Sequence, residues 1–270
     1  MASITDCVVD GLKYPFNDVK KLLCFGVLFT LINIIVVAVS VVSVDIARAI
    51  SASEVNHFWK FSQVVPANDM YIVSALAIIS FIISLVIMGY QYDIIKFAID
   101  RKNDLPEFGG ILNILINGVK YFIVTLVYNL IPAIVFVAGV QFLNADYIVS
   151  VIAVILFIIC NFLLIMGMAN MVDSGKIAKA FDVKEIIDKI ANLGWVKYVG
   201  IILFTIIVYA IIMVAIGIIL MLLTGAVAIA VNNAMAVAVV SAILEGLFVS
   251  PYISIFFNRV FGSVYREAIK

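Results

Sequence analysis

One ionisable side chain stands near the middle of a long apolar segment, and it is the strongest candidate for chemistry in these 270 residues. Glu245 lies within residues 234–257, and a charge near the centre of a membrane span costs about 3 kcal/mol. Ser241 precedes it by one helical turn, so its hydroxyl is placed to share the carboxyl proton. Two interpretations stay open: a proton or cation site on a transport path, or a neutral acid hydrogen-bonded between packed helices.

Small residues recur at every fourth position around Glu245. This packing ladder consists of Ala234, Ala238, Ala242, Gly246 and Ser250. Small side chains at this spacing allow another helix to approach closely. We therefore expect Glu245 to lie beside a helix–helix contact, made either with another span or with a second copy of the chain.

The remaining reactive residue types form no recognisable active-site pattern. One histidine and three cysteines are present, without metal-ligand or disulfide spacing. Motifs for phosphate binding, hydrolytic nucleophiles or zinc-dependent hydrolysis are also missing from the sequence. We expect no enzyme activity, no catalytic residues, no metal and no cofactor, because no nucleophile is paired with a base.

The composition is that of an integral membrane protein. Hydrophobic residues make up 66% of the chain and charged residues 13%, whereas soluble domains average roughly 45–50% and about 25%. The formal net charge is zero, which argues against a nucleic-acid partner because such proteins need a basic surface.

Six apolar runs are long enough to cross about 30 Å of hydrocarbon. They cover residues 22–44, 70–92, 121–143, 147–172, 198–222 and 234–257. The last two are separated at Asn232 and Asn233, and Pro132 and Pro251 should kink the third and sixth. We expect an all-α, polytopic membrane bundle of six transmembrane helices, forming a single transmembrane domain over residues 1–270.

The basic residues predict the orientation of the spans. Fifteen of the 17 Lys and Arg residues fall in the two terminal segments and in the second and fourth connections. Only Arg48 and Lys60 fall on the other side. Because cytoplasmic loops are enriched in Lys and Arg, we expect a multi-pass protein of the cytoplasmic (plasma) membrane with both termini cytoplasmic.

A short pattern of Gly, one or two apolar residues, Lys and Tyr precedes each odd-numbered span. Its copies end at Tyr14, Tyr121 and Tyr198, which predicts three hairpin repeats entered through short amphipathic cytoplasmic helices. The clearest such helix covers residues 182–193, with Asp182 as its expected N-cap. It is either structural or a site that senses lipid or docks a partner.

Several short motifs resemble the archaeal membrane proteins called domain of unknown function 4013. They include residues 12–15 with Asp18 and residues 20–21, then residues 89–90 at the end of a span. Residues 105–108, 117–120, Tyr128 with Pro132, and 178–181 also fit. The resemblance implies a six-span protein of the cytoplasmic membrane, and it implies no activity or catalytic residue.

Taken together, these patterns favour a non-enzymatic scaffold that organises the membrane or assembles partners. The alternative is a small transporter or channel with Glu245 as its intramembrane proton or cation site. The expected partners are the lipid bilayer and either a second copy of the chain or other membrane proteins, with no nucleic acid.

Overall fold

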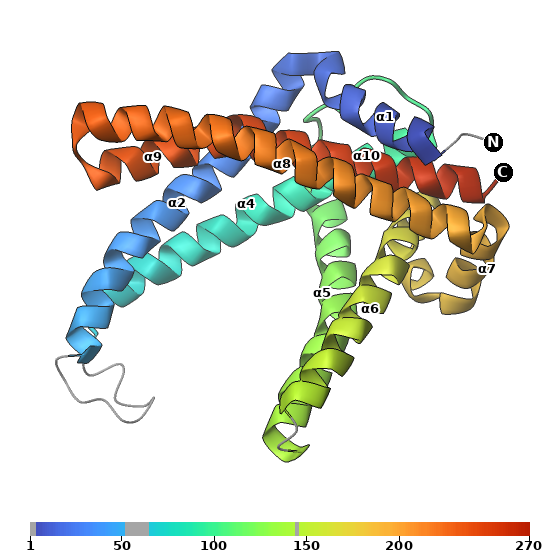
Figure 1. Cartoon of the computed structure of the whole chain (residues 1–270), viewed down its shortest axis with the longest axis horizontal. Coiled ribbons are helices and arrows are strands. Elements are labelled where there is room, and N and C mark those ends of the chain that lie inside the picture. The colour runs from blue at the N-terminus through green and yellow to red at the C-terminus, as the bar shows by residue number, and fades with distance from the viewer. Residues whose placement is uncertain (1–3, 52–64, 144–145) are drawn as a thin grey trace. The chain divides into compact units, whose positions relative to one another are not determined.

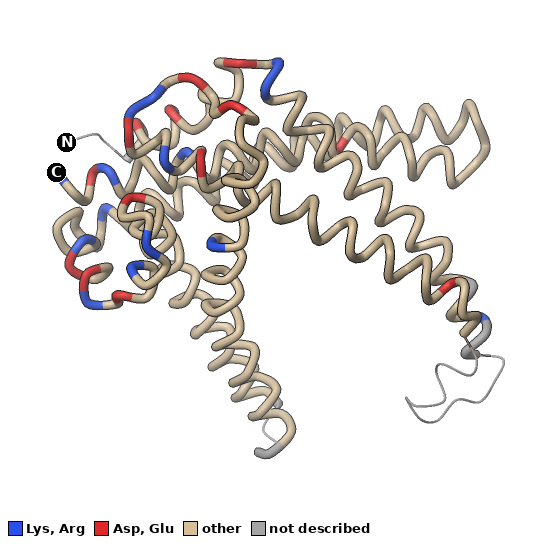
Figure 2. The backbone as a smooth tube through the Cα atoms, turned by 180° about the vertical axis from the view of Figure 1, so that it is seen from behind, with Lys and Arg blue, Asp and Glu red and all other residues tan. Residues whose placement is uncertain are grey.

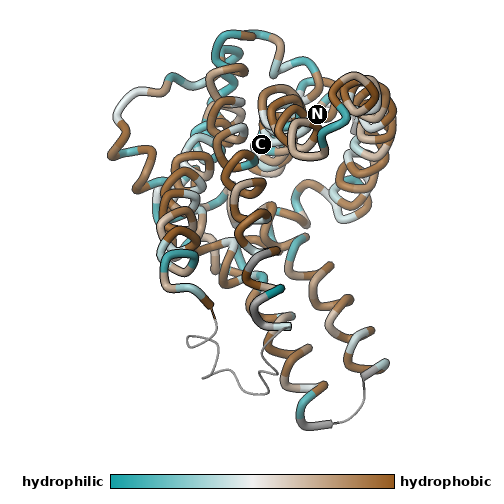
Figure 3. Tube along the Cα trace, turned by 90° about the vertical axis from the view of Figure 1, so that its left-hand side faces the viewer, coloured by the Kyte–Doolittle hydropathy of each residue, from teal (hydrophilic) through white to brown (hydrophobic). Residues whose placement is uncertain are grey.

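The computed structural model describes residues 4–51, 65–143 and 146–270. Within these ranges the chain is helical apart from short connections and contains no strand. Six of the described helices are long and apolar enough to cross a membrane, which confirms the expected six-span fold. Figure 3 shows hydrophobic residues along most of the length of these helices. Lys60, one of the two basic residues expected on the far side, lies outside the described residues.

The first five long helices are α2 (Val19–Ser51), α4 (Ala67–Ile99), α5 (Ile111–Leu143), α6 (Asp146–Ser174) and α8 (Trp195–Val231). The sixth consists of α9 (Ala234–Leu244), the π-helical turn η4 (Glu245–Val249) and α10 (Ser250–Ala268). The shorter elements are α1 (Ile4–Lys13), α7 (Val183–Leu193) and the 3₁₀ turns η1 (Tyr14–Asp18) and η3 (Ile177–Phe181). Several long helices have 33 residues, a length of about 50 Å that exceeds the hydrocarbon thickness.

The expected break at Asn232 and Asn233 is confirmed. Asn232 has a left-handed backbone (φ 46°), a conformation that Asn tolerates better than most residues. The side chain of Asn233 accepts hydrogen bonds from the backbone N–H groups of Met235 (2.9 Å) and Ala236 (3.2 Å). It therefore caps α9, as Asn does at many helix N-termini.

The cytoplasmic segments expected before the spans differ among themselves. Residues 183–193 form the separate helix α7, and the Asp182 carboxylate accepts from the N–H of Glu185 (3.2 Å). Residues 4–13 likewise form the separate helix α1. In contrast, residues 111–116 are simply the first turns of α5, which continues through Gly118 into the span that follows.

The chain divides into two compact units, each assembled from discontinuous segments. Unit 1 contains residues 1–21, 88–210 and 253–270, and unit 2 contains residues 22–87 and 211–252. Fifteen of the 17 basic residues belong to unit 1, where they gather at the ends of its helices (Figure 2). Within unit 1, α5 and α6 run side by side as a hairpin (Figure 1).

The main hydrophobic core lies in unit 1. It brings together residues of α1, α4, α5, α6, α7, α8 and α10, among them Tyr92, Tyr128, Met166, Ile186 and Phe256. An ion pair between a buried Arg and a partly exposed Asp stands beside this core. The Arg259 guanidinium, only 2% exposed, lies 2.7 Å from the Asp10 carboxylate and stacks 4.0 Å from the Tyr14 ring centroid.

Candidate functional site

Glu245 and Ser241, the candidate intramembrane polar site, both lie in unit 2. Glu245 is exposed and is the first residue of η4. The Ser241 hydroxyl donates to the carbonyl of Val237 at 2.8 Å. The Ser241 hydroxyl is therefore bonded to the backbone of its own helix.

The π-helical turn η4 immediately precedes the helical turn that contains Pro251, where the sequence predicts a kink. Proline has no N–H group and its ring crowds the carbonyl four residues earlier, here that of Leu247. The N–H of Ser250 donates instead to the carbonyl of Glu245, five residues back. Pro132, in contrast, lies inside α5, which is assigned as one continuous helix.

The packing ladder meets α2 within unit 2. Ala242 is 6% exposed, and its carbonyl accepts from the Asn33 side chain at 3.2 Å. A Cβ atom added to Gly246 would lie 2.5 Å from the Thr30 Cα atom. The backbones of η4 and α2 therefore touch at this point. Ala238 and Ser250 are half-buried, whereas Ala234 is exposed at the start of α9.

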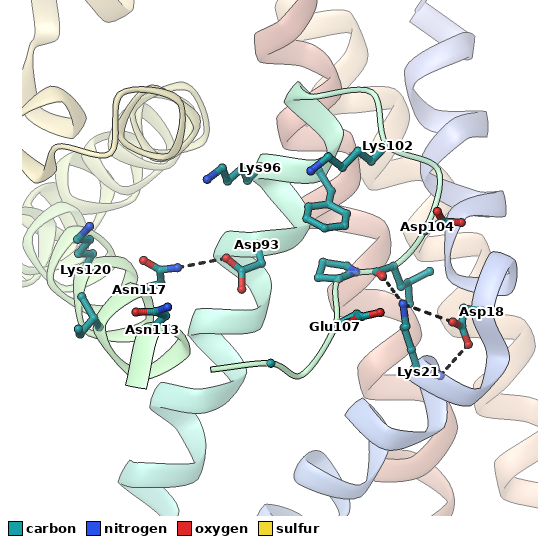
Figure 4. Close-up of a pocket in the computed structure, with 15 residues that line it drawn as sticks. Asp18, Lys21, Asp93, Lys96, Lys102, Asp104, Glu107, Asn113, Asn117 and Lys120 are labelled. Atoms are coloured by element: carbon teal, nitrogen blue, oxygen red, sulfur yellow. Dashed lines mark hydrogen bonds and ion pairs between the residues drawn. The ribbon is translucent and has the colours of Figure 1, made fainter. Parts of the chain in front are cut away.

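A polar cavity of about 830 Å³ lies in unit 1, and no pattern in the sequence analysis predicted it. The ends of α2, α4 and α5 and the connection 100–110 surround it (Figure 4). We call it the polar pocket. It is lined by Asp18, Lys21, Asp93, Lys96, Phe97, Lys102, Asp104, Leu105, Pro106, Glu107, Gly109, Asn113, Ile116, Asn117 and Lys120.

Buried contacts hold the connection 100–110 in place. Leu105 is 1% exposed, and its carbonyl accepts from the Lys21 ammonium at 2.8 Å. The Tyr90 hydroxyl donates to the Pro106 carbonyl at 3.0 Å, and the Tyr90 ring stacks on Phe108 with centroids 4.2 Å apart. These contacts make the wall of the pocket a packed structure.

The N-terminal segment supports the same connection from its other side. The Tyr14 hydroxyl donates to the Asp104 carbonyl at 2.7 Å. The Asn17 side chain donates to the Asn103 carbonyl at 2.9 Å. The connection is therefore held between the residues that precede α2 and the end of α4.

A close helix contact forms another part of the pocket. A Cβ atom added to Gly89 would lie 1.9 Å from the Ile114 carbonyl oxygen, so only glycine allows α4 and α5 to touch there. One turn further along α4, the Asn117 side chain donates to the Asp93 carboxylate at 3.1 Å. Asn113, Asn117 and Lys120 follow the 3–4-residue spacing of one helical face.

The charged groups of the pocket divide into paired and unpaired side chains. Lys21 lies 3.6 Å from Asp18, and Lys102 lies 3.8 Å from Asp100. Within the described part of the chain, the side chains of Lys96, Asp104 and Glu107 have no ion-pair or hydrogen-bond partner. The cavity therefore contains exposed charges of both signs that form no close ion pair, although Lys96 is near enough to Asp93 to act on it electrostatically.

A second polar cluster connects α7 to α6 and α10. The Lys189 ammonium lies 2.5 Å from Asn170 and 2.6 Å from the Tyr265 hydroxyl. Lys189 and Lys179 also bind Glu185, at 2.8 and 2.5 Å. These two cations lower the pKa of Glu185 from 4.5 to about 2. Because the neighbouring Ile186 and Ile190 are buried, this cluster fastens α7 to the bundle.

Several of the motifs that resemble domain of unknown function 4013 meet at the polar pocket. Asp18 and Lys21 come from the first motif region, and residues 105–107, Asn117 and Lys120 supply part of the remaining wall. Tyr14 and Tyr90, from two further motifs, hold the connection 100–110 by hydrogen bonds. This convergence was the available sequence signal for the pocket. No group of three or more His, Cys, Asp or Glu side chains suited to a metal ion occurs among the described residues.

No curated protein and no solved structure matches the chain. A family model does match, over residues 72–221, which is more than half of the sequence. The match includes the Tyr90 and Phe108 wall of the polar pocket and the whole of α5, α6 and α7. The chain belongs to the family described as "Protein of unknown function (DUF4013)".

Proposed function

We propose that this protein is a non-enzymatic scaffold that organises lipid in the cytoplasmic membrane, with both termini in the cytoplasm. The observation that carries the proposal is the position of the polar pocket beside apolar helix surface. Ile111 and Leu112, in the first turn of α5, are 69% and 71% exposed. Ile116 is 47% exposed and lines the pocket itself. Polar groups for a headgroup and apolar surface for its chains are thus adjacent.

The uneven distribution of basic residues supports the proposed orientation. The helix ends and connections of unit 1 hold fifteen of the 17 Lys and Arg residues, and such enrichment marks cytoplasmic segments. Fluorescent-protein fusions at each terminus test it. Fluorescence from both fusions is expected, since the reporter folds in the cytoplasm, and loss of fluorescence at either terminus would contradict the orientation.

Lipid organisation is tested by reconstituting the protein into giant vesicles that contain two labelled lipids. Enrichment of one lipid around the protein is expected, without any flux of protons or cations across the membrane. A lipid distribution that stays uniform around the protein would rule out the scaffold. An oligomer measured in the same vesicles would extend the proposal to assembly with a second copy.

A transporter with Glu245 on its pathway is the second candidate. Its support is the position of Glu245 at the first residue of a π-helical turn inside a spanning helix, because such turns often occur at functional sites. Glu245→Gln should abolish proton or cation flux while leaving the protein folded. Flux that is absent from the wild type, or unchanged in the variant, would eliminate this candidate.

A further inference from the structure

We propose that the polar pocket binds the headgroup of a phospholipid that carries a primary amine, the chemistry of an ethanolamine or serine phosphate ester. This inference rests on the proposed lipid-organising function and adds the class of lipid. The proposed roles are specific: Lys96 and Asn113 bind the phosphate, and Glu107 and Asp104 bind the ammonium group.

The balance of charge favours a ligand with both signs. Four Lys and four Asp or Glu residues line the pocket. A simple anion would meet as many repulsive charges as attractive ones, because Coulomb terms at similar distances cancel. A headgroup with a phosphate and an ammonium group presents one complementary charge to each set.

The two sides of the cavity differ in their balance of charge. Figure 4 shows the side chains of Asn113, Asn117 and Lys120 together on α5, with Lys96 extending from α4 toward them. Lys96 and Lys120 outnumber Asp93 on this side, and Asp18, Asp104 and Glu107 outnumber Lys21 and Lys102 on the other (Figure 4). A ligand therefore needs its charges at two ends, as an amino-alcohol phosphate ester has them.

The groups assigned to the ligand are those that the protein itself leaves unpaired. Lys96, Asp104, Glu107 and Asn113 have no side-chain hydrogen bond or ion pair among the described residues. A Lys–phosphate contact and a carboxylate–ammonium contact are both charge-assisted, and such hydrogen bonds are roughly twice as strong as neutral ones. The walls are already packed through Tyr90, Phe108 and Lys21, so binding has to order only the exposed side chains that contact the ligand.

A membrane lipid, rather than a free metabolite, is favoured by the apolar surface next to the pocket. Ile116 lines the cavity and lies on the same helix end as the exposed Ile111 and Leu112. Acyl chains attached to a bound headgroup would cover this surface, and burial of apolar area is favourable by about 25 cal/mol per Å². A soluble headgroup would leave it uncovered.

The test measures lipid binding to the full chain in detergent by native mass spectrometry. Equal amounts of phosphatidylethanolamine, phosphatidylcholine and phosphatidylglycerol are added to the wild type, Lys96→Gln and Glu107→Gln. Lys184→Gln and Asp188→Asn are matched controls, because both residues are exposed on α7 and lie outside the pocket. The wild type and both controls should retain phosphatidylethanolamine preferentially.

Each pocket variant should lower phosphatidylethanolamine binding about tenfold, the value of one charged hydrogen bond. Glu107→Gln should leave phosphatidylglycerol binding unchanged or increased, which a merely unfolded variant would not do. Equal binding of all three lipids by the wild type would overturn the proposal, as would an equal loss in the α7 controls. Binding of free phosphoethanolamine as tight as that of phosphatidylethanolamine would overturn the assignment to a lipid while keeping the headgroup chemistry.

Failure of the headgroup proposal and failure of the scaffold proposal give different experimental results. Lipid enrichment in giant vesicles without any headgroup preference would remove only the present inference. Uniform lipid around the protein would remove the scaffold, even if the pocket bound phosphoethanolamine from solution.

Discussion

Substitution of Gly89 by alanine should force α4 and α5 apart and distort the polar pocket. The added Cβ atom would lie 1.9 Å from the Ile114 carbonyl oxygen and 2.7 Å from its Cγ2 atom. A carbon and an oxygen tolerate a separation of about 3.3 Å, so the helices must part by about 1.4 Å. The nearest atoms belong to the backbone of Ile114, so the clash cannot be relieved by moving the end of a flexible side chain.

The energetic cost follows from two effects. Overpacking of this kind costs about 1–3 kcal/mol. The same displacement would stretch the 3.1 Å hydrogen bond between Asn117 and Asp93, and loss of that bond costs about 1 kcal/mol. A total of about 2–4 kcal/mol corresponds to a fall of roughly 5–15 °C in Tm for a chain of this size.

The assay is thermal unfolding in detergent, with Gly217→Ala as the control. Gly217 lies in α8, and nothing lies within 4 Å of an added Cβ atom. Alanine is favoured over glycine in helices by about 1 kcal/mol, so the control should be unchanged or slightly stabilised. If Gly89→Ala unfolds at the same temperature as Gly217→Ala, the close contact between α4 and α5 is wrong.

Two further predictions concern the charged contacts of unit 1. Arg259→Gln should destabilise the protein by about 1–3 kcal/mol, because it removes charge-assisted hydrogen bonds to Asp10, which is 38% exposed and stays partly hydrated. The same unfolding assay checks this, with the exposed Lys184→Gln as control, and a similar Tm for the two variants would contradict it. The carboxylate of Glu185 has a pKa lowered from 4.5 to about 2, so its stabilisation of α7 is present above pH 4.5 and is lost as the pH falls toward 2. Trp195 fluorescence in a Trp59→Phe background should show this acid transition, and Glu185→Gln should remove it; an identical transition in both proteins would contradict the assigned pair.

Local patterns predicted the parts of the fold that depend on neighbouring residues. Apolar run length gave the six spans, and the turn preference of Asn gave the break between α8 and α9. The cap of α7 followed from Asp182 and the spacing of its apolar residues. In each case the interaction joins residues within a few positions of one another, where sequence and space coincide.

The polar pocket could not be derived in the same way, because its contacts join distant residues. Tyr14 and Asp104 are 90 positions apart, and Lys21 and Leu105 are 84 apart. Arg259, expected only as a cytoplasmic cation of the last segment, is buried against Asp10, which precedes it by 249 positions. Hydropathy identified Glu245 because a charged residue stands out inside a long apolar run. Hydropathy gives no information on which polar helix ends and connections pack against one another.

The lengths of α4 and α5 bear on where the polar pocket meets the bilayer. Both helices have 33 residues, about 20 Å more than the hydrocarbon needs. If all of this excess projected into water, Ile111 and Leu112 would be hydrated at 69% and 71% exposure. Burying such side chains is worth roughly 1.5–3 kcal/mol each, so the membrane is expected to reach the first turn of α5 by tilt or local thickening. The mouth of the pocket then opens among lipid headgroups. Spin labels at Leu112 should therefore be protected from water-soluble quenchers, and full accessibility there would place the pocket in the cytoplasm instead.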